Sequence, residues 1–78
     1  MAARKKLRSN LAEILEERGI SLRELSRRIE HRPESVRLLA KNELSRIPVE
    51  LIEGVCTELE LELSELFTMG INTEITEG

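Results

Sequence analysis

The sequence predicts an all-α fold, a single compact domain of five short helices. Apolar residues recur at intervals of three and four residues along most of the chain, which places them on one side of a helix. Residue types that favour helix starts and stops, among them Pro33 and Pro48, separate these periodic segments. With 78 residues, 40 % of them hydrophobic, the chain can form one small core.

Three segments follow from this pattern. Residues 1–9 form a basic N-terminal arm, residues 10–67 form the helical domain, and residues 68–78 form a tail. In the tail, Ile71, Thr73 and Ile75 alternate with polar residues, which is a strand pattern. We expect the tail to be either disordered or a short strand.

The first helix is expected to start at Asn10, which can form a capping box with Glu13. Its apolar stripe consists of Leu11, Ile14 and Leu15. It is expected to end at Gly19, a residue type that is common directly after a helix.

The segment Ser21–Ala40 predicts two helices joined by a tight turn. Ser21 and Glu24 have capping-box spacing, and Pro33 suits the first turn of the second helix because its missing N–H would be unpaired there anyway. The second helix has a buried stripe of Val36, Leu39 and Ala40. Arg32, Pro33, Glu34, Arg37, Leu38 and Lys41 remain on its other side. This helix is too short to be stable alone, so it needs support from the rest of the chain.

The remaining elements supply that support. After a polar loop over residues 41–47, Pro48 opens a fourth helix with the apolar residues Leu51, Ile52, Val55, Cys56 and Leu59. Gly54 is expected on the opposite side, where it weakens the helix by up to about 1 kcal/mol. A fifth helix is expected over Ser64–Phe67, with Phe67 as the largest single contributor to the core.

Several classes of function lack the residues they need. The chain has one histidine, one cysteine and no aspartate, and no catalytic set, phosphate-binding glycine loop or metal-ligand cluster can be assembled. We therefore expect no enzymatic activity, no cofactor and no small-molecule ligand. No apolar run approaches the ~20 residues of a membrane span, and no signal peptide is recognisable, so we expect a cytoplasmic protein.

Charge is distributed unevenly along the chain. The net charge is −3, which taken alone argues against a nucleic-acid partner. However, all 12 Lys and Arg residues lie within residues 1–46, whereas residues 47–78 carry eight glutamates and no cation. Such a division can present one basic and one acidic face.

Four segments of the chain resemble one protein family in their order and spacing. The segments that carry this resemblance are LAEILEERGISLRELSRR, RPESVRLL, SRIPVELIEGVC and LELSELF. The region Leu11–Phe67, in which they lie, looks like the Cro/repressor (XRE-type) helix-turn-helix domain of bacterial and phage regulators. The resemblance implies a repressor-like transcriptional regulator that binds specific double-stranded DNA, with a recognition helix at about Pro33–Ala40. The alternative is a protein-interaction module on the same scaffold, such as an antirepressor. Binding of single-stranded nucleic acid is disfavoured, because Phe67 is the only aromatic residue and is expected to be buried.

The resemblance also implies roles for individual residues. The side chains expected to face the bases are Arg32, Pro33, Glu34, Arg37 and Leu38. Those expected to contact the DNA backbone are Arg23, Arg27, Lys41, Asn42, Arg46, Arg4, Lys5 and Lys6. The chain departs from the family pattern at Glu30, where glycine is usual, and at Leu22, where glutamine is frequent.

We also expect a homodimer, because one short recognition helix can distinguish only a few base pairs. The segment Leu63–Thr76 is the expected interface, with Leu63, Phe67, Met69, Ile71 and Ile75 as its apolar residues. A strand formed by the tail could pair with its counterpart across a two-fold axis. The alternative is a monomer with a frayed tail.

Overall fold

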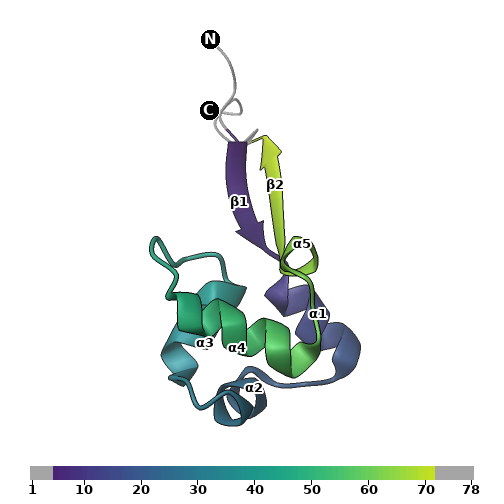
Figure 1. Ribbon diagram of the computed structural model, residues 1–78, viewed down its shortest axis with the longest axis vertical. Coiled ribbons are helices and arrows are strands. Elements are labelled where there is room, and N and C mark those ends of the chain that lie inside the picture. The colour runs from purple at the N-terminus through teal and green to yellow at the C-terminus, as the bar shows by residue number, and fades with distance from the viewer. Residues whose placement is uncertain (1–4, 72–78) are drawn as a thin grey trace.

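The computed structural model describes residues 5–71, in which five helices and a two-stranded sheet are present. The elements in chain order are β1 (Lys5–Ser9), α1 (Leu11–Arg18), α2 (Leu22–Arg28), α3 (Pro33–Ala40), α4 (Val49–Leu59), α5 (Leu63–Leu66) and β2 (Phe67–Ile71). The helices pack together into one body, and the two strands project from it side by side (Figure 1).

A single apolar core holds the helices together. Each helix contributes at least one side chain that is less than 2 % exposed: Leu11, Leu25, Val36, Leu39, Leu51, Val55, Leu59 and Leu66. The helices are four to eleven residues long, a range in which isolated helices are marginal at best in water. Burial in this shared core, rather than helix propensity, therefore keeps each helix folded.

Four of the described helices end in the same geometry. A residue one or two positions after the helix has a left-handed backbone, with φ of 68° at Gly19, 56° at Glu30, 61° at Asn42 and 54° at Glu60. At each end, the N–H of the following residue donates to the carbonyl five residues earlier, as His31 does to Ser26 at 2.9 Å. This Schellman arrangement satisfies carbonyls that the helix leaves unpaired and turns the chain toward the next element.

The starts of the helices correct two expectations. Ser21 caps α2 as expected, since its Oγ accepts a hydrogen bond from the Glu24 N–H at 3.0 Å. The Glu24 carboxylate, however, pairs with Arg27 and Arg28 instead of closing a capping box. At α1, Asn10 is the N-cap residue as expected, but it forms no capping box with Glu13, and the Leu11 N–H donates instead to the Ser9 Oγ at 3.1 Å.

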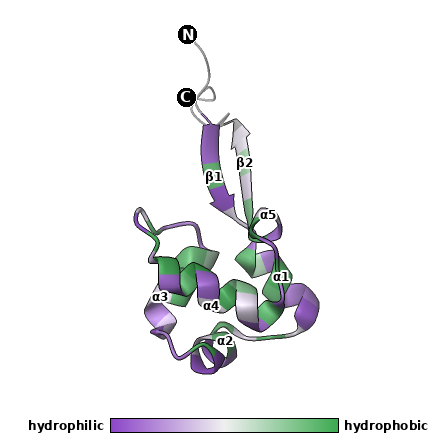
Figure 2. Ribbon diagram, viewed as in Figure 1, coloured by the Kyte–Doolittle hydropathy of each residue, from purple (hydrophilic) through white to green (hydrophobic). Residues whose placement is uncertain are grey.

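The N-terminal arm and the start of the tail form a sheet, of which the sequence predicted at most a short strand in the tail. β1 and β2 are antiparallel, with Lys5 opposite Ile71, Leu7 opposite Met69 and Ser9 opposite Phe67. The all-α expectation therefore holds for the helices but not for residues 5–9 and 67–71. β1 gave little signal, because it is hydrophilic apart from one hydrophobic band (Figure 2). Arg4, Thr73 and Ile75 lie outside the described residues.

Two expectations about packing were also wrong. Leu66, not Phe67, is the fully buried residue at the fifth helix, and Phe67 is partly buried at the start of β2. Gly54 does not lie on a free side of α4, because a Cβ there would come within 3.3 Å of the Ile29 Cβ. Glycine at position 54 thus allows α4 to approach the end of α2 closely.

The first testable prediction concerns the end of α1. Gly19→Ala should lower the free energy of unfolding by about 1 kcal/mol, because alanine is strained at a φ of 68° while the space around the position is open. Gly70→Ala is the matched control, since Gly70 also faces open space and its backbone is not left-handed. Urea unfolding followed by circular dichroism measures both. Equal stabilities of the two variants would contradict the assignment of the cost to backbone strain.

Candidate nucleic-acid interface

The turn between α2 and α3 places the two helices against the core and against each other. α2 buries Leu25 and Ser26, and α3 buries Val36, Leu39 and Ala40. The Ser26 hydroxyl donates to the Arg23 carbonyl at 2.8 Å, so this buried polar group is satisfied within its own helix. The opposite side of α3 is left facing solvent, which is the arrangement that a groove-binding helix requires.

The structure brings together the residues expected to face DNA bases. Arg32, Pro33 and Glu34 are exposed at the start of α3, and Arg37 and Leu38 are partly exposed one turn later. All five stand apart from the buried stripe of this helix. Pro33 occupies the first turn, so the helix begins where the sequence predicted.

Two of these residues pair with each other. The Arg37 guanidinium donates to the Glu34 carboxylate at 2.7 Å, with 41 % and 65 % of the two side chains exposed. An exposed ion pair of this kind contributes about 0.2–1 kcal/mol. The ion pair is therefore weak enough for the Arg37 guanidinium to exchange Glu34 for another hydrogen-bond acceptor.

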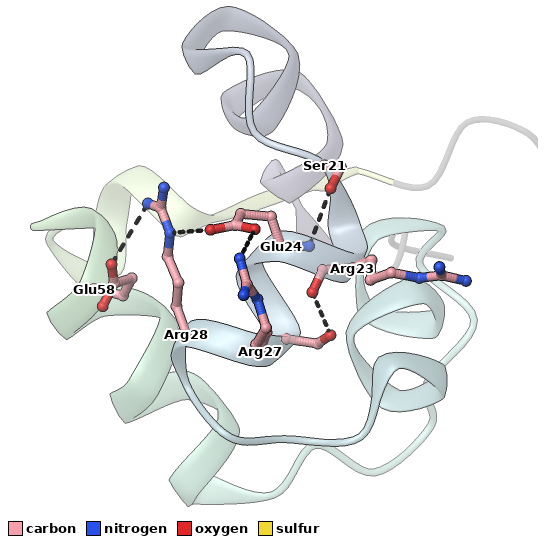
Figure 3. Close-up of polar contacts among 7 residues, drawn as sticks. Ser21, Arg23, Glu24, Arg27, Arg28 and Glu58 are labelled. Atoms are coloured by element: carbon pink, nitrogen blue, oxygen red, sulfur yellow. Dashed lines mark hydrogen bonds and ion pairs between the residues drawn. The ribbon is translucent and has the colours of Figure 1, made fainter.

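The cations of α2 divide into two groups (Figure 3). The Arg27 and Arg28 side chains converge on Glu24, and their hydrogen bonds hold the pKa of its carboxyl below the usual value. Arg28 also reaches Glu58 of α4 at 3.6 Å. The Arg23 side chain points away from this cluster into solvent (Figure 3). Arg23 is therefore the α2 cation best placed for a phosphate contact, and Arg27 remains accessible with 75 % of its side chain exposed.

The loop after α3 and the strand β1 carry further cations. Lys41 and Arg46 are exposed in the loop, and Lys5, Lys6 and Arg8 are exposed on β1. Arg8 was not among the expected contacts, although it belongs to the same basic segment. Asn42 differs from the other expected phosphate contacts, because both polar atoms of its side chain are hydrogen-bonded to the backbone of Ser9.

Some apolar residues of the expected dimer surface are exposed. Leu63 is 59 % and Met69 58 % exposed, and Met69 lies opposite Leu7, which is 47 % exposed. Leu7 was missed by the sequence analysis, because its relation to Met69 depends on pairing of distant segments. Phe67 packs partly against the core, and Ile71 is the last residue of β2.

The described residues show no metal site or reactive thiol site that would suggest another chemistry. No group of three or more His, Cys, Asp or Glu side chains within residues 5–71 could hold a metal ion.

Cys56 is partly buried beside the core, and its burial, reinforced by Glu62 and Glu65, raises the pKa of the thiol. None of the helices in this part of the chain is both long enough and apolar enough to cross a membrane.

Comparisons with known proteins agree with this geometry. A comparison with solved structures finds the transcriptional regulator VanUg, with a TM-score of 0.70 and 16 % sequence identity over 92 % of this chain and 93 % of that one. At this identity the similarity concerns the fold. The search of curated proteins gave no match. A family model, that of the Cro/C1-type helix-turn-helix DNA-binding domain, matches residues 10–69. The match includes all five helices and most of the chain, and the chain therefore belongs to the Cro/C1-type helix-turn-helix DNA-binding domain family.

Proposed function

We propose that this protein is a transcriptional regulator of the repressor type that binds specific double-stranded DNA through α3. The observation that carries the proposal is the position of the cations. The exposed side of α3 bears Arg32 and Arg37, and exposed cations on α2 and on the following loop flank it in the sequence. In this family α3 enters the major groove while α2 crosses the backbone. The fold shared with the regulator VanUg supports the same role.

The α3 side chains match known contacts to base edges. Arginine donates two hydrogen bonds to guanine O6 and N7, which suits Arg32 and Arg37. Glu34 can accept from the cytosine N4 amino group, and Leu38 can contact a thymine methyl group. Pro33 has no donor and contributes shape alone. Specificity thus rests mainly on Arg32, Glu34 and Arg37.

The flanking cations supply affinity that does not depend on sequence. Arg23, Lys41 and Arg46 are exposed and can each neutralise one phosphate, which releases condensed counterions. The net charge of −3 does not exclude this, because residues 1–46, which carry all these cations, hold 12 Lys and Arg against seven Glu.

We also propose that the protein acts as a homodimer. Short recognition helices need two half-sites to select one location among many competing sites. Leu7 and Met69 form an exposed apolar pair across β1 and β2, and within the described residues the outer edge of β2 pairs with no further strand. Pairing of β2 with its counterpart would bury Met69 and extend the sheet across a two-fold axis.

A protein-interaction module is the second candidate function. The three glutamates of α4, Glu50, Glu53 and Glu58, line a shallow hollow of about 350 Å³ next to Gly54, together with Arg28 and Ile29. A basic partner could bind there. Such a module would show no salt-dependent DNA binding, which separates it from the first proposal.

The experiment that tests DNA binding is selection of sites from random duplexes, followed by titration of variants. Arg32→Ala and Arg37→Ala should each weaken binding to the selected duplex by about 1–3 kcal/mol and relax base preference at one position, because each removes a contact to a base edge. Fluorescence anisotropy with the selected and a scrambled duplex measures the difference. An equal loss on both duplexes would show that these arginines contact phosphates only.

The loop cations should behave differently from the α3 residues. Lys41→Ala and Arg46→Ala should weaken binding to both duplexes equally and lower the slope of log K against log salt by about one unit each. Thr57→Glu changes the net charge by the same amount at an exposed site on α4 and serves as the control. A slope that Lys41→Ala and Thr57→Glu change equally would assign the effect to net charge rather than to phosphate contacts.

The dimer is tested by sedimentation equilibrium. The double variant Leu7→Gln, Met69→Gln should shift the protein from dimer to monomer, because it removes the exposed apolar pair without touching the core. Val49→Gln is the control, since Val49 is 64 % exposed but lies on α4. A wild-type protein that stays monomeric at tens of micromolar would contradict the homodimer.

A further inference from the structure

The side chain of Asn42 joins two segments that are 33 residues apart. Its Oδ1 accepts from the Ser9 N–H at 2.6 Å, and its Nδ2 donates to the Ser9 carbonyl at 3.2 Å. The two bonds together satisfy both backbone groups of one residue, and we call them the Asn42–Ser9 clamp. Asn42 directly follows Lys41 at the end of α3, and Ser9 is the last residue of β1. The clamp therefore connects the end of α3 to the base of the sheet.

The end geometry of α3 does not by itself require these bonds. Asn42 has a φ of 61°, which asparagine tolerates better than most residues but glycine tolerates best. At the other three left-handed helix ends the chain has Gly19, Glu30 and Glu60, so the fold accepts different residue types there. What asparagine adds at position 42 is the pair of hydrogen bonds to Ser9.

Ser9 links the clamp to the start of α1. It is 5 % exposed, and its Oγ accepts from the Leu11 N–H at the start of α1. The next residue, Asn10, is bonded to the other end of the domain: its N–H donates to the Leu66 carbonyl at 2.7 Å, and its side-chain amide donates to the Thr68 Oγ1 at 2.8 Å. A two-stranded sheet is marginally stable alone, so its orientation depends on bonds such as these at its base.

The clamp brings β1 next to the loop that follows α3. Lys6 and Leu7 of the strand and Asn42 and Ser45 of the loop line one hollow of about 200 Å³ between the two segments. Lys6 and Arg8 are both exposed, and successive residues of a strand face opposite sides, so these two lie on the side away from Leu7. The cations of the strand and the proposed dimer residue thus occupy different faces.

We propose that Asn42 is a positioning residue for DNA binding. The clamp holds β1 beside the loop after α3, so that Lys6 and Arg8 contact the phosphates next to those contacted by Lys41 and Arg46. This inference rests on the proposed function and adds the sheet to the DNA-binding surface. Asn42 itself contacts the Ser9 backbone rather than a phosphate. Without the clamp, the strand cations would have to be ordered anew each time DNA binds.

The test uses Asn42→Gly, which keeps the left-handed backbone and removes only the clamp. Glu60→Gly is the matched control, because Glu60 is exposed, has a φ of 54° and lies at the end of α4. Circular dichroism checks folding. Hydrogen exchange of the Ser9 amide reports on the clamp without DNA, and should become faster in Asn42→Gly and stay unchanged in Glu60→Gly.

Salt titrations with the scrambled duplex report on positioning. In the wild-type background, the double variant Lys6→Ala, Arg8→Ala should lower the salt slope by about two units. In the Asn42→Gly background, the same two changes should lower it by less than one unit, because the strand no longer reaches the phosphates in a fixed position. Arg46→Ala should lower the slope equally in both backgrounds, since the loop follows α3 directly.

Each outcome decides one point. An unchanged salt slope in Lys6→Ala, Arg8→Ala overturns the inference, and this variant retains the clamp and exposes no core, so it stays informative if Asn42→Gly does not fold. Equal effects of the double variant in both backgrounds also overturn it. A wild-type protein that binds no duplex overturns the proposed function itself, whereas failure of the inference alone leaves wild-type binding and the α3 contacts intact.

Discussion

Burial of a few leucine and valine side chains in one shared core is the constraint on which the rest of the structure depends. No helix among the described residues exceeds eleven residues, so none gains enough from its own backbone hydrogen bonds to persist alone. Each fully buried leucine contributes about 1.5–3 kcal/mol relative to exposure, and it does so only when the other helices are in place. The exposed side of α3 is a consequence: once Val36 and Leu39 are in the core, Arg32, Glu34 and Arg37 face outward.

Helix positions and the outward side of α3 could be predicted because both depend on local patterns. The spacing of Val36, Leu39 and Ala40 settles which side of α3 is buried, and Pro33 settles where it starts. The ion pair between Glu34 and Arg37 also follows from a separation of three residues on a helix. The sheet could not be predicted in the same way, because β1 pairs with a segment at the far end of the domain. For the same reason nothing near Asn42 indicated Ser9 as its partner.

The left-handed helix ends show how far backbone geometry can prevail over residue type. Gly19 is the residue expected from conformational preference, yet Glu30 and Glu60 adopt the same geometry at a cost of roughly 1 kcal/mol each. Glu30, where the family usually has glycine, therefore makes the turn between α2 and α3 less favourable in free energy, while the turn keeps the geometry seen at Gly19. In each case the hydrogen bonds to the preceding helix carbonyls hold the turn.

The pairing of β1 with β2 has a consequence for biosynthesis. Roughly sixty residues separate β1 from β2, so at about 5–20 residues per second of synthesis β1 waits several seconds for its partner. α1 to α4 can meet during this interval, since their contacts span shorter distances along the chain. Contacts among these helices would thus form while the strand that carries Lys6 and Arg8 is still unpaired, and the sheet would close after them.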